Sequence, residues 1–271
     1  MNLGQNIKTI RKERGITQEK LAEYMEVSVQ AVSAWERDEY YMDLAKFFSM
    51  ADYYDVSLDT LAYGRTKLFE VKKDIYNWEH MKTFVKTTAK DANLTNTLKA
   101  LDYATDAHKG QTRRQSDIPY IYHPLNMACH ALAMNINDDD MIAACLLHDV
   151  VEDCNKTVDE LPVDARVKEL VELLTHEKTN DKNRDRIMEK YYEKLTQNPK
   201  ASLIKLLDIC NNTSSMAWGL SHEHIVRSIK EADKYYPLLL KTVKSTLKFN
   251  NAAFLLQYQI ESTLNIYKAF M

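Results

Sequence analysis

The sequence predicts an all-α protein in which a small N-terminal domain precedes a larger helical domain. Helical periodicity dominates the chain: Val167, Leu170, Val171 and Leu174, for example, recur at the spacing of one buried helix face. Only five glycines and five prolines occur in 271 residues, which leaves little room for hairpins, and convincing strand alternation is absent. These observations favour helices packed on helices over any sheet.

Composition narrows the class of protein further. A content of 45% hydrophobic and 28% charged residues is ordinary for a soluble globular protein. No apolar run approaches the ~18 residues of a membrane span, and the N-terminus lacks the apolar core of a signal peptide. The four cysteines show no CxxC spacing, which indicates reduced thiols rather than a disulfide or zinc site. We therefore expect a cytoplasmic protein without membrane contact.

Residues 1–64 have the pattern of a separate helical domain. Leu3, Ile7 and Ile10 open a first helix, which Gly15 stops. Thr17 is placed to cap a second helix, and Ser28 to cap a third that runs from Val29 to about Glu36. A short helix, a short turn and another helix make the helix-turn-helix arrangement. Residues 65–93 then predict a connecting helix, and residues 94–271 form the larger domain.

This N-terminal region resembles the Cro/CI-type repressor fold, through residues 10–22, 27–37 and 55–61. The resemblance implies that the helix from Val29 to Glu36 enters the major groove of DNA. It also implies a homodimer, because this fold typically works on two half-sites. The residues expected to contact DNA are Gln30 and Ser33 at base edges, with Gln18 and Arg37 near phosphates.

The charge balance of this domain argues against DNA. Residues 1–64 hold seven basic and eleven acidic side chains, a net charge of −4, while the rest of the chain carries +1. DNA-binding domains usually have a basic footprint. A local patch is still expected from Lys8, Arg11, Lys12, Arg14 and Lys20. Asp38 also replaces the glycine usual in this fold, so a protein-interaction role is the alternative.

The most informative segment of the larger domain runs from Leu147 to Asp153. It follows the apolar residues 142–146, with Asp138 to Asp140 as possible caps, and is predicted to lie on a buried helix. On one helix, His148 and Glu152 would share a face with the two aspartates. Three carboxylates beside an apolar segment repel each other unless something positive lies among them. A divalent metal is the simplest explanation, and a solvated acidic helix end is the alternative.

Two further segments add candidate ligands to this one. Pro124 suits the first position of a helix and places His123 at its start. In residues 203–208 an apolar helix carries Asp208 beside its core face. The set His123, His148, Asp149 and Asp208 mixes nitrogen and oxygen ligands. Such a set suits manganese, iron or zinc better than calcium.

Four segments together resemble the HD-type hydrolase domain of the RelA/SpoT family, especially its small alarmone hydrolases. They are residues 107–114, 119–124, 144–153 and 205–212. The resemblance implies that the four candidate ligands hold Mn²⁺ and that Glu152 and Asp153 are catalytic groups that handle the attacking water. It further implies that Arg113, Arg114 and Asn212 contact the substrate. For Ser215 the resemblance implies the same role more weakly.

The chain also departs from the family pattern around the substrate. Ile209 stands where a basic residue is usual, and Asn211 where an aromatic residue or histidine is common. We therefore expect a manganese-dependent hydrolase that releases pyrophosphate from nucleotides such as ppGpp or ppApp. A phosphohydrolase acting on another nucleotide, such as NADPH, is one alternative. The other is a transcription regulator whose HD domain senses a nucleotide without hydrolysing it.

Overall fold

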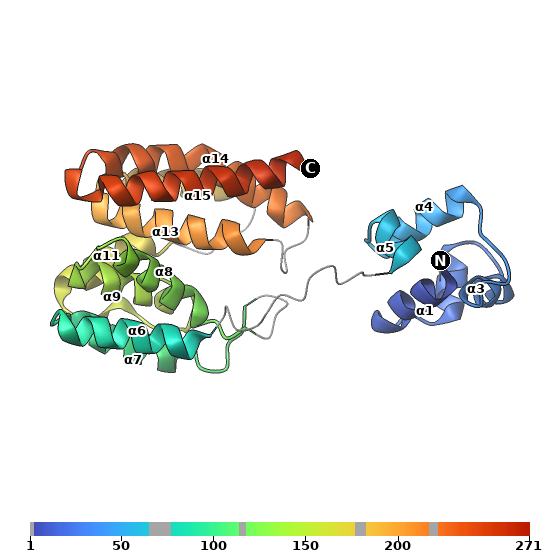
Figure 1. Ribbon diagram of the computed structural model, residues 1–271, viewed down its shortest axis with the longest axis horizontal. Helices are drawn as coiled ribbons and strands as arrows, with labels where there is room; N and C mark the ends of the chain where they lie inside the picture. Colours follow the sequence, from blue (N-terminus) through green and yellow to red (C-terminus); the bar gives the residue numbers. More distant parts are fainter. Residues whose placement is uncertain (1–2, 65–76, 114–117, 177–182, 217–221) are drawn as a thin grey trace. The chain divides into compact units, whose positions relative to one another are not determined.

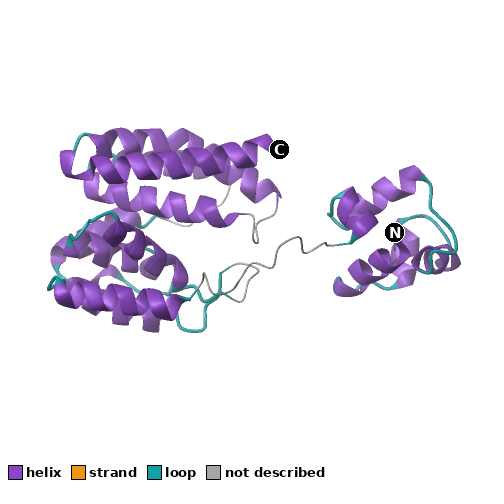
Figure 2. Cartoon of the chain, viewed as in Figure 1, coloured by secondary structure: helices purple, strands orange, loops and turns teal. Residues whose placement is uncertain are grey.

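The computed structural model describes residues 3–64, 77–113, 118–176, 183–216 and 222–271, and these are mainly helical (Figure 1, Figure 2). No strand lies within these ranges; an isolated antiparallel bridge joins Thr112 and Pro119. The chain divides into two compact units, Met1–Lys72 and Lys73–Met271. The predicted all-α class, with a small unit before a larger one, is confirmed.

The first unit consists of short helices joined by tight turns. They are α1 (Leu3–Glu13), α2 (Gln18–Tyr24), α3 (Val29–Glu36), α4 (Leu44–Tyr53) and α5 (Leu58–Tyr63). Both predicted caps are present: the hydroxyl of Thr17 accepts from the Lys20 N–H, and that of Ser28 from the Ala31 N–H, each at 3.2 Å. Trp35 is buried in the core of this unit, as its place on α3 predicts.

The structure explains how an aspartate at position 38 replaces the glycine usual in this fold. Its φ of 53° is left-handed, a conformation that glycine adopts freely and that aspartate tolerates better than most residues. The carboxylate is also used, because its Oδ1 accepts the N–H of Gly4 at 2.7 Å. At Gly4 itself, a Cβ would lie only 2.3 Å from the Trp35 carbonyl oxygen, so glycine permits this close approach of α1 to the end of α3.

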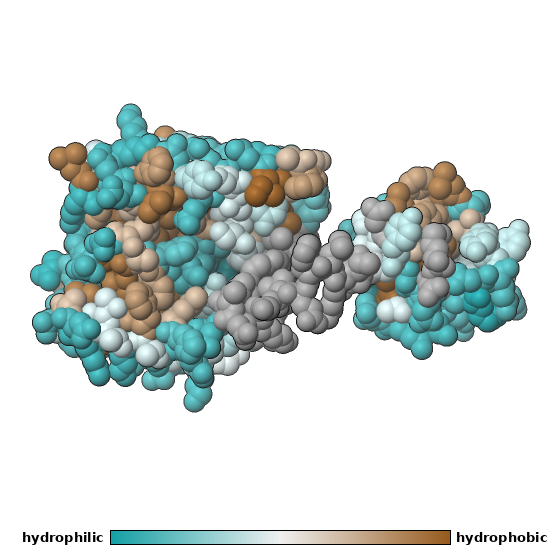
Figure 3. Space-filling model, viewed as in Figure 1, coloured by the Kyte–Doolittle hydropathy of each residue, from teal (hydrophilic) through white to brown (hydrophobic). Residues whose placement is uncertain are grey.

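An exposed apolar surface surrounds the start of α4. Tyr40, Tyr41, Leu44 and Phe48 all remain exposed, three of them by more than two thirds of their area. Figure 3 shows apolar residues gathered on this side of the first unit. Contiguous exposed apolar groups of this kind mark interaction sites more often than scattered single ones do.

The second unit is a stack of longer helices around one core. Its helices are α6 (Trp78–Asp91), α7 (Thr95–Ala107), α8 (Tyr122–Ala133), α9 (Asp139–Leu147), α10 (Val150–Asp153), α11 (Ala165–Leu174), α12 (Arg184–Leu195), α13 (Pro199–Ser215), α14 (His222–Lys244) and α15 (Asn250–Ala269). Among the described residues, none of these helices combines the length and apolarity that a membrane crossing requires.

Helix α6 packs against α7 and α8. Val85 and Ala89 on its inner face are fully buried in the core of the second unit. The helix begins at Trp78, and residues 71–76 of the expected connecting helix lie outside the described residues. The described part of that segment is therefore a layer of the second unit, and its apolar face is covered by this unit.

The helix expected across Leu147–Asp153 is broken. Helix α9 ends at Leu147 and α10 begins at Val150, so His148 and Asp149 form the turn between them. Asp138 caps α9 by accepting the Met141 N–H at 3.2 Å. The prediction of one continuous helix was wrong, because no glycine or proline marks the break. Asp149 is the N-cap of α10, and its carbonyl oxygen still accepts the Asp153 N–H at 2.9 Å.

Candidate active site

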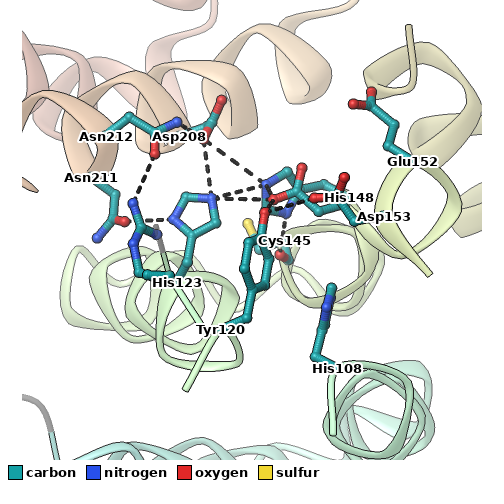
Figure 4. Close-up of polar contacts among 12 residues, drawn as sticks. His108, Tyr120, His123, Cys145, His148, Glu152, Asp153, Asp208, Asn211 and Asn212 are labelled. Carbon is teal, nitrogen blue, oxygen red and sulfur yellow. Dashed lines mark hydrogen bonds and ion pairs between the residues drawn. The ribbon is translucent and has the colours of Figure 1, made fainter. Parts of the chain in front are cut away.

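Two histidines and two aspartates meet at one point in the second unit (Figure 4). His123 comes from the first turn of α8, His148 and Asp149 from the turn before α10, and Asp208 from α13. The Nε2 atoms of the two histidines are 3.2 Å apart. Asp149 Oδ2 lies 3.0 Å from His148 Nε2, and Asp208 Oδ1 lies 3.2 Å from His123 Nε2. The structure thus brings together all four side chains that the sequence singles out as metal ligands.

Local sequence explains how these side chains reach the same point. Helix α8 starts at Tyr122, two residues before the predicted start, and Pro124 still lies in its first turn, where a missing N–H costs little. His123 is consequently inside the helix and 1% exposed. On α13 the buried face formed by Leu203, Leu206 and Leu207 brings Asp208 to the edge of the core.

The remaining ring nitrogens fix how both imidazoles face the cluster. His123 Nδ1 lies 2.5 Å from Asn211 Oδ1, and His148 Nδ1 lies 2.9 Å from the carbonyl oxygen of Cys145. Both partners only accept, so each Nδ1 donates its hydrogen and each Nε2 points into the cluster, where its lone pair becomes available to a cation once that nitrogen is deprotonated. Facing lone pairs beside two carboxylates are what a divalent cation requires, and metal-bound histidines usually have such outer partners.

The charges around the cluster strongly shift the pKa values of its side chains. Burial lowers the pKa of His148, but the adjacent Asp149 and Asp208 outweigh this and raise it to about 9. Burial would raise the pKa of Asp149, yet the two histidines hold it below its usual range. Asp208 is held low against burial by Lys205, whose Nζ lies 2.7 Å from its Oδ2. The group therefore retains negative charge on both carboxylates, as a cation site needs.

Tyr120 links the cluster to Asp153, one of the two predicted catalytic carboxylates. The Tyr120 hydroxyl is 2.6 Å from Asp149 Oδ2 and 3.0 Å from Asp153 Oδ2. Burial and the charge of Asp149 raise the pKa of this phenol, so it remains a hydrogen donor. Asp153 is thus joined through Tyr120 to the candidate ligand Asp149.

Glu152, the other predicted catalytic carboxylate, lies elsewhere. Its Oε1 is 2.8 Å from both the backbone nitrogen and the Nδ1 of His176, which follows α11. Figure 4 shows Glu152 apart from the cluster, with no contact drawn to it. Glu152 and His148 both line the cavity, but Glu152 pairs with His176 and not with a candidate metal ligand.

A cavity of about 450 Å³ opens from the cluster. Arg113 lines it, and its Nη2 lies 3.2 Å from Asn212 Oδ1 and 3.1 Å from Ser215 Oγ. Three of the four predicted substrate residues therefore contact one another beside the candidate ligands, and Asn212 also donates to Asp208 Oδ1 at 2.6 Å. The fourth, Arg114, lies outside the described residues.

Sequence reasoning missed several residues of this cavity. Lys205 lies in a segment that was recognised, yet its ion pair with Asp208 was not foreseen. His176 and Tyr191 also line the cavity and belong to none of the recognised segments. Asn211, an apparent change in the substrate pocket, instead supports the imidazole of His123. The one sequence signal that could have identified these positions is the burial expected of residues around a helical core.

The predicted DNA-contacting residues of the first unit divide into two groups. Gln18 donates at 2.8 Å to Glu36, which is buried and paired with Arg11. Arg37 contacts Ser33 and forms a two-point pair with Glu39, each bond at 2.7 Å. Gln30 is exposed on α3. Two of the four residues predicted to contact DNA, Gln18 and Arg37, are thus hydrogen-bonded to acidic side chains of the same unit.

Comparison with known proteins agrees with this division into two units. A helix-turn-helix family model matches residues 7–61, and an HD domain model matches residues 100–207. The chain therefore carries a helix-turn-helix domain followed by an HD domain. The resemblance of each unit to its family, predicted from the sequence, is confirmed.

Relatives of the HD domain are pyrophosphohydrolases. A Mus musculus protein named guanosine-3′,5′-bis(diphosphate) 3′-pyrophosphohydrolase MESH1 is 36% identical over 41% of this chain and 64% of its own length. The Escherichia coli bifunctional (p)ppGpp synthase/hydrolase SpoT is 30% identical over 52% of this chain and 21% of its own length. The chain thus spans less than two thirds of these relatives. Its HD domain is related to hydrolase enzymes.

A solved structure has the same fold as this domain. It is described as a metazoan ortholog of SpoT that hydrolyses ppGpp, and it aligns with a TM-score of 0.52 at 24% identity. The alignment covers 64% of this chain and 96% of that one. The shared fold accounts for nearly the whole of the other chain.

Proposed function

We propose that the protein hydrolyses 3′-pyrophosphorylated nucleotides of the ppGpp or ppApp type, releases pyrophosphate, and requires a divalent cation, chiefly Mn²⁺. The observation that supports this most is the convergence of two imidazole nitrogens and two carboxylate oxygens at the cavity that Arg113 lines. The similarity to 3′-pyrophosphohydrolases supports the choice of substrate class.

The donor set fits the proposed cation. His123, His148, Asp149 and Asp208 would hold it through atoms that already face one another. When bound, such a cation acts as a Lewis acid on a phosphoryl oxygen and lowers the pKa of a water towards neutrality. The mixture of imidazole and carboxylate suits manganese, although other transition metals accept the same ligands.

The surrounding residues supply the remaining functions. Asp153, steadied by the Tyr120 hydroxyl, accepts the proton that the attacking water loses. Arg113 offers a planar guanidinium to phosphate oxygens, which it can bind at two points. Asn212 and Ser215 hold that guanidinium in the cavity and change partners when a phosphate arrives.

The substrate base and sugar are the less constrained part of the proposal. Ile209 lines the cavity where the related family carries a basic residue, so one phosphate contact is replaced by an apolar one. This favours testing NADPH and nucleoside phosphates beside ppGpp and ppApp. Purified protein with Mn²⁺ should release pyrophosphate from at least one 3′-pyrophosphorylated nucleotide. A panel without any such turnover would overturn the proposal, and ligand-dependent DNA affinity without turnover would identify a sensor.

We also propose that the first unit binds DNA as part of a homodimer in the cytoplasm. The helix-turn-helix match and exposed Gln30 support DNA binding, and the apolar surface around Leu44 and Phe48 supports a second copy. The four unpaired cysteines suit a reducing compartment. Fluorescence anisotropy with promoter DNA tests the first claim, and sizing chromatography tests the second. If the protein is a monomer at micromolar concentration and does not bind DNA, a protein-interaction role is favoured instead.

A further inference from the structure

Glu152 and His176 form a pair that lies beside the metal cluster without joining it. Both side chains line the cavity, and they come from α10 and from the residue after the C-cap of α11. One oxygen, Glu152 Oε1, is 2.8 Å from His176 Nδ1 and 2.8 Å from the His176 backbone nitrogen. Two contacts to one residue fix the imidazole relative to the carboxylate.

This pairing determines which ring nitrogen is left for chemistry. An ionised carboxylate only accepts, so Nδ1 of His176 carries a hydrogen and donates it. In the described part of the chain no hydrogen bond engages Nε2, and about a quarter of the side chain is exposed, at 26%. A carboxylate behind an imidazole also holds the ring in one orientation, as it does in hydrolase triads. His176 thus has its second nitrogen available to a molecule in the cavity.

A continuous wall connects His176 with the proposed cation site. The His176 and Tyr191 rings have centroids 5.1 Å apart, and Lys205 Nζ lies 5.5 Å from the Tyr191 centroid. The same Nζ is 2.7 Å from Asp208 Oδ2. His176 therefore lines the same cavity as the candidate ligands and is linked to Asp208 through Tyr191 and Lys205, while among the described residues no contact joins it directly to a candidate ligand. A substrate bound at the cluster has room to extend between the two.

The proposed reaction has a requirement that the cluster does not meet. Water forms a new P–O bond, the bond between phosphorus and the ribose 3′ oxygen breaks, and that oxygen leaves with the electron pair. An alkoxide is a poor leaving group unless it receives a proton. Asp153 takes a proton from the water, which leaves the leaving-group side without a donor. Resting on the function proposed above, we propose that His176 enters the step with hydrogen on both ring nitrogens, donates the Nε2 proton to the 3′ oxygen, and keeps the Nδ1 hydrogen bonded to Glu152.

Glu152 is then a positioning residue and His176 a catalytic one. The water supplies hydroxide to phosphorus and a proton to Asp153, while His176 supplies the proton that completes the 3′ hydroxyl. Solvent exchange returns one proton to His176 and removes one from Asp153, so the cycle balances as one water consumed. This assigns the two acidic neighbours in the sequence to opposite sides of the scissile bond.

The test compares two leaving groups. H176A and H176Q are assayed with ppGpp, or with whichever 3′-pyrophosphorylated nucleotide the wild type hydrolyses, and with its analogue that has sulfur as the bridging 3′ atom. A thiolate leaves without a proton, so a general acid matters only for the oxygen substrate. Turnover of the oxygen substrate should fall by ~10²–10⁴, the usual contribution of acid–base assistance. Turnover of the sulfur analogue should change far less, and added imidazole should partly restore H176A.

Controls distinguish the possible failures. E152Q should lose oxygen-substrate turnover in the same direction but by less, because the imidazole remains while its orientation weakens. H80A removes an exposed imidazole from α6 and should behave as wild type. Metal content and melting temperature establish that the variants fold. Equal losses on both substrates, or no loss, overturn this inference alone, whereas a wild type that hydrolyses neither nucleotide overturns the proposed function with it.

Discussion

Each unit buries a cluster of charged side chains, and the two clusters differ in how their charges are balanced. In the first unit Arg11 contacts Glu36 through two nitrogens, at 2.5 and 3.0 Å, and gives a third hydrogen bond to the Ile16 carbonyl. Gln18 then fills the remaining space on Glu36. One positive and one negative charge cancel, and every group has a partner within the unit.

The cluster of the second unit is not balanced in this way. Asp149 and Asp208 face two imidazole Nε2 atoms, and Lys205 pairs with Asp208 alone. The group also opens to a cavity, which the Arg11–Glu36 pair does not line. Burial of charge is therefore not by itself a sign of function. The informative feature is the convergence of imidazole nitrogens and carboxylate oxygens at an open cavity.

The largest expected effect comes from breaking the unbalanced cluster. H123A removes one of four candidate ligands, and Mn²⁺ affinity should fall by more than the ~10–100-fold typical of losing an outer partner. Turnover should fall with it. Elemental analysis and a pyrophosphate-release assay measure both, with H80A as the matched control. Full manganese occupancy in H123A would mean that this imidazole is a structural part of α8.

Removing one partner from the balanced pair should destabilise rather than inactivate. E36Q leaves the buried guanidinium of Arg11 uncompensated, which typically costs about 3–5 kcal/mol. Hydrogen exchange over α1–α3 should rise, while manganese binding by the second unit stays unchanged. The double variant R11M/E36L removes both charges and should recover most of the stability. Loss of manganese binding in E36Q would contradict the distinction between the two clusters.

A subtler change tests the partner that aims His123. In N211A, His123 is still present, but its Nδ1 loses the oxygen that accepts its hydrogen. The Mn²⁺ affinity should therefore fall ~10–100-fold. Titration calorimetry of metal-free protein measures the affinity. N251A removes an exposed amide from α15 and serves as control. Unaltered affinity in N211A would show that the other contacts of His123 suffice to orient it.

The smallest expected effect is the acid response of the balanced pair. Burial raises the pKa of Glu36, but hydrogen bonds from Arg11 and Gln18 outweigh it and hold the pKa below its ordinary 4.5. The pair therefore stabilises the first unit fully above that value, and the contribution is lost as pH falls through the lower folded pKa. Urea unfolding at pH 6, 4.5 and 3.5 should show this loss in wild type. A pH dependence identical in E36Q would assign it to other groups.

The sequence predicted the helices better than it predicted the side-chain partners. Periodicity and caps located α2, α3 and α11 closely, because these signals act within a few residues. The resemblance placed His123 and Asp208 together although 85 positions separate them in the chain. The contact of Glu152 with His176 was not predictable, because the two residues are 24 positions apart and no local signal links them. The inward orientation of Gln18 was not predictable either, because its partner Glu36 lies in another helix.

The turn between α9 and α10 has a consequence for how the site can change. Asp149 is the N-cap of α10, and its carbonyl oxygen accepts the Asp153 N–H at 2.9 Å. The Tyr120 hydroxyl joins the side chains of the same two residues. A substitution that moved α10 would therefore move a candidate metal ligand as well. Metal retention and the placement of Asp153 are expected to be kept or lost together.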